Sequence, residues 1–338
     1  MNLIRKKPHP ATTMSENAWK ITSISQLSVL LEVSSPKPGN VNRLRRFSDT
    51  GYRHFLASAS LLGRGLFKSA DRGAQLVAGT IGLEEVGLGA LILECSKDVF
   101  SGLNQRNTII GTILLYIPVV VAAGATVSKK GEFDTQALKS WIEKIIDHTT
   151  VDDTLDVFRA FHLANPRGNR NQEIQTWTGI HDRFDFNNPK VMENIKQDNI
   201  TLQEMFRISS EVEPISKEWS EYFNLTIGEV YPYLDGVSTC IDDLEEGVVR
   251  TFIWLLARQP DGLIIKKAGI GKAREIQELA KKIVASETGN KDTTHLLDEL
   301  DSILREDGNR HNPGTTADFV SVAILLRLLD MTFHRPSR

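Results

Sequence analysis

The sequence predicts an all-α fold, a single large bundle of about a dozen helices around a buried apolar helix. Three observations predict it. Apolar residues recur at three- and four-residue spacing along most of the chain, alternating strand patterns are scarce, and one long segment carries no charged residue. No Asn-Gly or Asp-Gly turn lies between two alternating runs, and no internal repeat of fixed period occurs.

The helices are placed in order by their apolar spacing. The first follows Ser15, where Trp19, Ile24 and Leu27 recur. Further helices are expected at 52–67, 83–93, 108–127, 134–146 and 151–163. In the second half they are expected at 202–222 with an interruption by proline, and at 244–256, 272–284 and 316–329. Long polar loops, which often carry function, are expected at 34–50, 165–175, 178–189, 259–269 and 305–315.

The composition is that of a soluble globular protein. Of the 338 residues, 41% are hydrophobic and 25% are charged, and the net charge is −3. This balance argues against a disordered chain and gives no overall positive field for nucleic acid or an anionic membrane. Cys95 and Cys240 form neither a disulfide framework nor a zinc site, and the N-terminal residues lack the apolar segment of a secretory signal. We therefore expect a cytoplasmic protein without nucleic-acid or membrane partners.

The segment from Thr108 to Val127 has no charged residue and is long enough to span a bilayer. Pro118 lies near its middle, and Gly111 and Gly124 interrupt its apolar surface. A helix that is apolar on all sides can equally form the buried centre of a soluble bundle. We predict the buried helix, and association with a membrane is the alternative.

The loop at 34–50 combines a restricted backbone with basic side chains. Two prolines restrict the backbone around Lys37, and Gly39 allows it to approach a ligand closely. Four cations follow one another closely, namely Lys37, Arg43, Arg45 and Arg46. Such a group can hold phosphates, and a solvated basic turn is the alternative. Asp49 then either caps the next helix or contacts a ligand.

Two further polar pairs stand at the beginnings of predicted helices. At Asn107 and Thr108, backbone N–H groups either meet an anionic ligand or are simply capped. Asp152 and Asp153 provide carboxylates that suit Mg²⁺, which binds through one or two carboxylates plus substrate phosphates. The same two acids also complement a helix dipole, so both interpretations remain open.

The last polar segments lie in the C-terminal third of the chain. Asp261 precedes the stretch Gly-Leu-Ile-Ile-Lys-Lys. The turn into the final helix contains Arg310, Asn312, Gly314 and Thr315. Asp318 lies one turn inside that apolar helix, where an unpaired acid is costly to bury. We therefore expect Asp318 either to cap the helix or to contact a ligand.

Taken in order, these segments resemble the CitG family, the triphosphoribosyl-dephospho-CoA synthases. The likeness begins with Pro-Lys-Pro-Gly-Asn-Val-Asn-Arg at 36–43 and ends with Asn-Pro-Gly-Thr-Thr-Ala-Asp at 312–318. Similar stretches lie between them at 49–50, 55–59, 87–92, 107–111, 153–168 and 261–267. Because the motifs lie at both ends of the chain, we expect one all-α catalytic domain at 15–335 after a flexible tail at 1–14.

The resemblance implies a transferase. In that family the ribose 2′-hydroxyl of dephospho-CoA displaces adenine from ATP, and the triphosphoribosyl product is the precursor of a prosthetic group. The implied substrates are ATP, with Mg²⁺ at its phosphates, and a dephospho-CoA-like small molecule. Whether the chain forms a homo-oligomer is left open.

Residue type and the resemblance together give the candidate site residues. The expected catalytic carboxylates are Asp49, Asp261 and Asp318. The residues expected to bind the nucleotide are Lys37, Gly39, Asn40, Arg43, Asn107, Thr108, Arg310, Asn312, Gly314 and Thr315. Asp152 and Asp153 are expected at a metal ion. The roles of base, metal ligand and ribose contact are not sorted among the carboxylates.

One segment departs from the family pattern. Bacterial members typically carry His-Lys where this chain has Ile109 and Ile110. Two alternatives follow from this departure. One is a related transferase with a different acceptor, and the other is a non-catalytic helical protein that binds a nucleotide without turnover. Release of adenine from ATP discriminates an enzyme from a binding protein.

Overall fold

The structure is a computed structural model that describes residues 10–100, 108–164, 180–238, 240–289 and 292–334. Within these ranges the chain forms helices and no strand, which confirms the predicted all-α fold. The first elements are α1 (Pro10–Ser34), α2 (Tyr52–Leu61), α3 (Gly63–Ala78), the 3₁₀ turn η1 (Leu83–Glu85), α4 (Leu88–Phe100), α5 (Ile110–Lys130), α6 (Thr135–Asp147) and α7 (Val151–Ala164).

The remaining helices complete the bundle. They are α8 (Ile180–Arg183), α9 (Val191–Gln197), α10 (Leu202–Ser209), α11 (Pro214–Ser220), the π-helical segment η2 (Thr226–Val230), α12 (Tyr231–Val237), α13 (Leu244–Arg258), α14 (Gly262–Ala268), α15 (Ile270–Thr288), α16 (Thr294–Arg305) and α17 (Gly314–Phe333). α1 begins inside the segment 1–14 that the sequence assigns to a tail. One core cluster contains buried residues from α1 to α17, and the domain boundaries at 15–335 stay a prediction.

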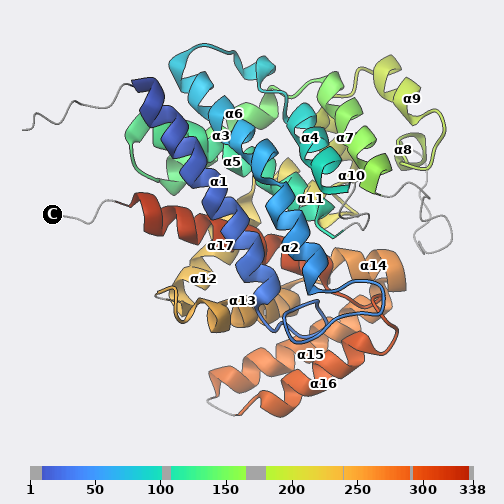
Figure 1. Ribbon diagram of the computed structural model, residues 1–338. Helices are drawn as coiled ribbons and strands as arrows, with labels where there is room; N and C mark the ends of the chain where they lie inside the picture. The colour runs from blue at the N-terminus through green and yellow to red at the C-terminus, as the bar shows by residue number, and fades with distance from the viewer. Residues whose placement is uncertain (1–9, 101–107, 165–179, 239, 290–291, 335–338) are drawn as a thin grey trace, which may run out of the picture.

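α5 is the central helix of the bundle (Figure 1). Every residue from Gly111 to Val127 is buried, and 94% of its most apolar window lies inside the molecule. Among the described residues it is the one helix long and apolar enough to cross a membrane, a test that core helices of soluble proteins also pass. α3 packs closely along it, because a Cβ on Gly73 or Gly124 would lie 2.0 Å from a backbone oxygen of the facing helix. These contacts confirm the predicted buried apolar helix.

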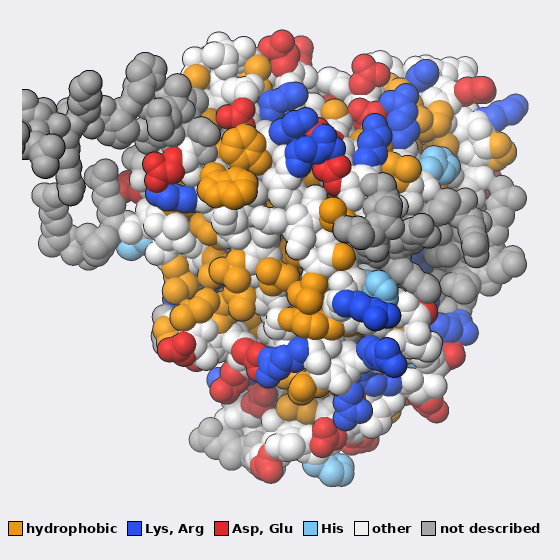
Figure 2. Space-filling view, in the orientation of Figure 1, with side chains coloured by type: hydrophobic (Ala, Val, Ile, Leu, Met, Phe, Trp, Pro, Cys, Tyr) orange, Lys and Arg blue, Asp and Glu red, His pale blue; other side chains and the backbone are white. Residues whose placement is uncertain are grey.

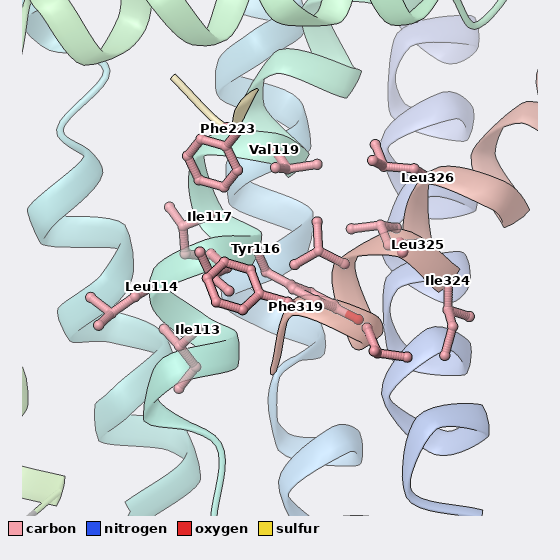
Figure 3. Close-up of a cluster of buried hydrophobic side chains, with 14 of the residues drawn as sticks. Ile113, Leu114, Tyr116, Ile117, Val119, Phe223, Phe319, Ile324, Leu325 and Leu326 are labelled. Carbon is pink, nitrogen blue, oxygen red and sulfur yellow. The ribbon is translucent and has the colours of Figure 1, made fainter. Parts of the chain in front are cut away.

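A buried hydroxyl cluster joins α1, α5 and α17. The hydroxyl of Tyr116 on α5 lies 2.7 Å from Ser28 Oγ on α1 and 2.7 Å from Ser321 Oγ on α17. It also donates a hydrogen bond of 2.9 Å to the carbonyl oxygen of Ser321. Figure 3 shows this tyrosine among apolar side chains, with Phe319 of α17 beside it. Because buried polar groups are stable only when partnered, the cluster fixes the three helices relative to one another.

Two groups of helices pack on this core (Figure 1). α7 to α10 surround a separate apolar cluster that comprises Leu155, Phe158, Phe184, Val191, Ile195 and Met205. α15 and α16 lie at the opposite end of the molecule, where the loop after α1 packs against α16. In that loop the Gly39 N–H donates to Asp301 Oδ1 at 2.7 Å. Gly39 has a φ of +66°, and a Cβ would lie 2.3 Å from Leu304, so glycine is required there.

The surface carries charges of both signs. On the face shown in Figure 2, Lys and Arg side chains lie among Asp and Glu side chains, and apolar side chains cross the middle of the face. Trp19 and Leu27 on α1 are 60% and 41% exposed, and Met331 on α17 is 43% exposed.

Candidate active site

A cavity of about 630 Å³ lies where the loop after α1 meets the beginnings of α5, α14 and α17, with α7, α10 and α11 completing its wall. Residues that line it come from segments far apart in the sequence, at 40–50, 108–112, 262–267 and 309–318. α5 and α17 are long helices, and both begin at the cavity. Helix beginnings favour anions through their N–H groups and dipoles. The fold thus brings together most of the polar segments that the sequence singles out.

Oxygen atoms without partners mark the polar end of the cavity. Asp49 Oδ2 accepts a hydrogen bond of 2.9 Å from Asn309 Nδ2, whereas Asp49 Oδ1 is buried without a partner. Asn312 Oδ1 is buried without a partner as well. Lys267 Nζ donates to the carbonyl oxygen of Asn309 at 3.2 Å. Burial lowers the pKa of Lys267, and the charges of Asp261 and Asp49 oppose this shift.

Asp318 lies one turn inside α17 and lines the cavity. Its Oδ1 accepts a hydrogen bond from the Thr112 hydroxyl on α5. A Cβ on Gly111 would lie 2.0 Å from Asp318 Oδ2, so only glycine lets α5 approach this closely. Burial raises the pKa of Asp318 well above its usual range, and nearby carboxylates, foremost that of Glu32, add to the shift. Asp318 therefore holds a proton at a higher pH than an exposed aspartate.

Among the other acids that line the cavity, Glu32 and Glu213 have raised pKa values. Glu32 comes from the last part of α1, and burial raises its pKa while the Lys37 ammonium opposes the rise. Glu213 caps α11, because its Oε2 accepts a hydrogen bond of 2.8 Å from the Ser216 N–H. Burial raises the pKa of Glu213 as well, and its hydrogen bonds to Ser216 and the charge of Lys266 oppose this rise. The cavity therefore contains several carboxyl groups whose protonation depends on their neighbours.

The opposite wall of the cavity is aromatic. Its phenylalanines are Phe158, Phe161, Phe184, Phe186 and Phe206. The rings of Phe161 and Phe186 meet edge to face with centroids 6.1 Å apart, and Phe206 stacks on the buried Trp219 at 4.5 Å. Aromatic walls of this kind offer flat apolar surface to a ligand. One cavity thus combines a polar end with an aromatic wall.

The structure brings seven of the candidate residues to the cavity. They are Asn40, Asp49, Thr108, Asn312, Gly314, Thr315 and Asp318. Asn107 lies outside the described residues. The remaining candidates do not line the cavity.

Lys37, Gly39 and Arg43 support the loop after α1. Lys37 is fully buried, and its Nζ lies 2.9 Å from Glu32 Oε1. Gly39 packs against α16. Arg43 donates to both carboxylate oxygens of Glu245 and, at 3.2 Å, to the carbonyl oxygen of Ser34. Two cations of the basic cluster, Lys37 and Arg43, are therefore engaged by the protein itself.

Asp261 and Arg310 hold turns near the cavity. Asp261 is 2% exposed and caps α14, because its Oδ1 accepts hydrogen bonds from the N–H groups of Leu263 and Ile264. Its Oδ2 accepts from the N–H and hydroxyl of Thr316 on α17, at 2.7 and 2.8 Å. Arg310 donates to the carbonyl oxygen of Lys267 at 2.7 Å. Asp261 thus ties the beginnings of two helices together.

Asp152 and Asp153 stand apart from the cavity. Asp152 is exposed, and Asp153 accepts hydrogen bonds from the Gly89 N–H at 2.7 Å and from the N–H and hydroxyl of Thr150 at 2.8 and 2.9 Å. Over the described ranges no group of three or more His, Cys, Asp or Glu side chains is arranged to hold a metal ion. The contacts of Asp153 are those of a residue that joins α4 to α7.

Several cavity residues are not among the candidates predicted from the sequence. They are Glu32, Glu213, Lys266, Lys267, Asn309 and the aromatic wall. The two lysines end the Asp-Gly-Leu-Ile-Ile-Lys-Lys stretch, so that motif already contained a signal. An acid within the apolar run Leu-Leu-Glu-Val was the signal for Glu32. The phenylalanines gave none, because apolar side chains at helical spacing are typical of a core.

The comparison with protein families decides the relationship. The model of the CitG family, described as ATP:dephospho-CoA triphosphoribosyl transferase, matches residues 18–337. The chain belongs to the CitG family. This membership confirms the resemblance seen in the sequence.

A solved structure agrees with the CitG fold. It is a crystal structure from Archaeoglobus fulgidus described as a triphosphoribosyl-dephospho-CoA synthase, 24% identical with a TM-score of 0.56. The match covers 81% of this chain and 98% of that chain. At this identity the likeness supports the fold. A comparison with curated proteins gives no match.

CitG membership makes the chain a transferase. The family activity moves the triphosphoribosyl group of ATP to dephospho-CoA, so ATP and dephospho-CoA are the implied substrates. The enzyme class predicted from the sequence is confirmed, and the alternative of a non-catalytic binding protein has no support from the family match.

Proposed function

We propose that the 630 Å³ cavity is the active site in which this CitG-family enzyme transfers the triphosphoribosyl group from ATP to dephospho-CoA. The observation that carries the proposal is the convergence of distant polar segments on one cavity. The loop after α1 and the beginnings of α5, α14 and α17 all contribute to its lining. A catalytic site requires such convergent polar groups in a concave pocket.

The polar end suits the triphosphate of ATP. Lys266 and Lys267 supply positive charge there, and the N–H groups at the beginnings of α5 and α17 favour anions. The lining carboxyl groups outnumber these lysines, namely Glu32, Asp49, Asp185, Glu213 and Asp318. A bare triphosphate would be repelled by several of these acids, so we expect it to bind with a divalent cation.

Asp49 and Asn312 fit a magnesium ion. Each has a buried side-chain oxygen without a partner, and oxygen is the donor that Mg²⁺ prefers. Mg²⁺ commonly uses one or two protein oxygens and takes its other ligands from phosphates and water, which agrees with the small donor set here. When bound, the ion would neutralise charge on the triphosphate. The lysines and the N–H groups at the helix beginnings would still contact the phosphates directly.

The chemistry also needs proton transfer at the ribose. The attacking hydroxyl loses a proton, and the departing adenine accepts the electron pair of the broken C1′–N bond. Asp318 retains its proton because of burial and like charges, so we assign it to protonate the adenine ring. Positive charge that develops on the ribose ring is stabilised by nearby carboxylates, as in other glycosyl transfers. The aromatic wall offers a stacking surface to the adenine rings of both substrates.

The test is adenine release. Purified protein with ATP, Mg²⁺ and dephospho-CoA should release adenine, measured by chromatography, and a chelator should stop the release. Lys267→Met should raise the KM for ATP about 10- to 100-fold, since it removes a charge-assisted contact to phosphate. Lys281→Met is the control, because Lys281 pairs with Glu278 on the exposed face of α15. Absence of adenine release from the wild type, or an unchanged KM in Lys267→Met, would contradict the proposal.

The family is one of soluble biosynthetic enzymes, and we also propose a cytoplasmic location without membrane association. The burial of α5 inside the molecule supports this. Recovery of the protein without detergent checks it, and detergent-dependent recovery would contradict it.

A further inference from the structure

Lys37 has an unusual position for a lysine. Its side chain is 0% exposed, although lysine is almost never fully buried without a partner. Its Nζ donates to the carbonyl oxygens of Glu32 and, at 3.3 Å, of Ser35, and it lies 2.9 Å from Glu32 Oε1. An ammonium group has three donors, and three oxygens surround this one. The protein thus encloses the positive charge completely, and Lys37 has no access to the cavity.

Glu32, in contrast, reaches the cavity. Its side chain is 8% exposed and belongs to the cavity lining. Glu32 and Lys37 lie at the end of α1 and in the loop that follows, so a short piece of chain contributes both charges. A buried carboxyl group without a counterion takes up a proton, whereas one beside an ammonium remains ionised. Lys37 therefore keeps Glu32 ionised, and the negative charge of the Glu32 carboxylate faces the cavity.

Glu32 and Asp318 have opposite surroundings. The charges that face Asp318 are the carboxyl groups of Glu32, Asp261 and Glu213, and its donor is the neutral hydroxyl of Thr112. The charge that faces Glu32 is the ammonium of Lys37, and the hydroxyl of Tyr116 lies near both carboxyl groups. Two carboxyl groups that share a buried site seldom ionise together, so one proton is favoured on Asp318 and the charge on Glu32.

From this geometry we propose that Glu32 is the catalytic base that accepts the proton of the attacking hydroxyl, and that Lys37 is a positioning residue that keeps Glu32 ionised and directed to the cavity. The inference rests on the proposed function, since it concerns the reaction in the same cavity. It gives the buried ion pair a role in catalysis in addition to its role in folding.

The two carboxyl groups together balance the protons of the reaction. The hydroxyl of dephospho-CoA gives its proton to Glu32, and its oxygen forms a bond to the ribose C1′ of ATP. The bond between C1′ and the adenine nitrogen breaks, and its electron pair goes to adenine. Asp318 gives its proton to adenine, so one proton is accepted and one is donated. Transfer of a proton from Glu32 to Asp318, directly or through solvent, restores the starting state.

The first test is Glu32→Gln, which keeps the size of the side chain and removes the base. We expect kcat for adenine release to fall about 100- to 10,000-fold, the usual contribution of a general base, with a smaller change in the KM for ATP. Lys37→Met should also lower kcat near neutral pH. In that variant Glu32 takes up a proton more readily, so kcat should recover as the pH rises. The acidic limb of the profile of kcat against pH should therefore move to higher pH. Lys37→Arg keeps the positive charge, so the acidic limb of its profile of kcat against pH should lie at the same pH as in the wild type.

The double variant Glu32→Gln with Lys37→Met separates catalysis from folding. Loss of one partner of a buried pair leaves an uncompensated charge, whereas loss of both leaves neutral groups of similar size. We expect the double variant to melt closer to the wild type than Lys37→Met does, while its kcat stays as low as that of Glu32→Gln. If kcat returned together with stability, the pair would be structural only, and the inference would be wrong.

Asp301→Asn is the matched control. Asp301 pairs with Arg305 at 2.8 Å and holds the same loop through the Gly39 N–H, but it does not line the cavity. We expect lower stability without a shift in the pH profile of kcat. Wild type without adenine release would contradict the proposed function itself. Wild type with adenine release and a Glu32→Gln variant of normal kcat would contradict only the role of Glu32.

Discussion

At the residue scale, burial and hydrogen-bond partners distinguish the residues that support the cavity from the residues that line it. Asp261 and Asp318 are both buried acids near the cavity, but Asp261 has four donors around its carboxylate, whereas Asp318 accepts a hydrogen bond from the Thr112 hydroxyl. Both are predicted from the sequence to be catalytic carboxylates, because each is an acid beside a helix beginning. The contact between Asp261 and Thr316 does not follow from local spacing, since it joins residues far apart in the chain. Lys37 has its partners within its own segment, and its complete burial is what the sequence does not show.

The contacts of Asp261 lead to a prediction on stability. Asp261→Ala removes the cap of α14 and its link to α17, which should cost about 2–4 kcal/mol of unfolding free energy. Urea unfolding measures this cost. In the folded variant at low temperature, kcat should remain within about tenfold of the wild type, because no oxygen of Asp261 is left for a substrate. Asp134→Ala, which removes the cap of α6, is the control, with an expected cost of about 1 kcal/mol. A stable Asp261→Ala variant without activity would instead support the catalytic role that the sequence predicts.

At the element scale, helices with a strong apolar periodicity could be predicted from the sequence, whereas the points at which a helix is divided or begins could not. The helix expected at 52–67 is divided into α2 and α3 around Leu62, and the one expected at 83–93 begins only after Gly87, whose φ is +62°. The interruption by proline that the sequence predicts within 202–222 lies at Pro214, which occupies the first turn of α11. α16 is not among the predicted helices, although its apolar residues recur on one face at helical spacing, namely Leu296, Leu297, Leu300, Ile303 and Leu304. The breaks depend on packing between helices, which a single sequence does not show.

The beginning of α5 leads to a prediction on activity. Gly111→Ala would place a methyl group against Asp318, where a Cβ meets the Oδ2 atom at 2.0 Å. Because Asp318 must move, we expect kcat to fall at least about 100-fold, as when a catalytic group is misplaced by an ångström. Steady-state adenine release measures the loss. Gly131→Ala at the end of α5 has open space around its Cβ and serves as a control for helix stability, although its φ of +73° adds strain. Full activity in Gly111→Ala would show that Asp318 is not held as the structure indicates.

At the scale of the whole molecule, a near-neutral net charge conceals an uneven interior. The net charge is −3, yet the cavity has more acids than lysines, and further acids are buried elsewhere. The sequence predicts a local anion site at the basic loop, whereas the structure places lysines of α14 at the cavity and encloses Lys37. Composition could exclude classes of protein, but the distribution of charge required the tertiary contacts.

The buried acids lead to a prediction on the pH dependence of stability. Burial raises the pKa of Glu218 from 4.5 to about 7, although its hydrogen bonds to Thr226 oppose the rise. A carboxyl group whose pKa is higher in the folded state stabilises the fold fully below the unfolded value and loses that contribution as the pH rises to the folded value. Unfolding free energy should therefore decrease by about 3 kcal/mol between pH 4.5 and 7 because of this group.

Glu218→Gln removes this titration and provides the check. Its thermal midpoint should exceed that of the wild type more at pH 7 than at pH 5, while adenine release stays unchanged, since Glu218 does not line the cavity. The pKa values of Asp318 and Glu213 are also raised, so part of the dependence of unfolding free energy on pH will remain in the variant. An equal difference between variant and wild type at both pH values would disprove the assignment.

The hydroxyl cluster of Tyr116 has a consequence for the way activity is lost on heating. Each member lies one helical turn from a residue of the site on its own helix, as the pairs Ser28 and Glu32, Tyr116 and Thr112, and Ser321 and Asp318 show. The separation of the two carboxyl groups is thus set by the axial register of three helices. Sliding of one helix by a single residue would displace its carboxyl group by about 1.5 Å. Turnover should consequently disappear at a temperature at which the helices themselves are still intact.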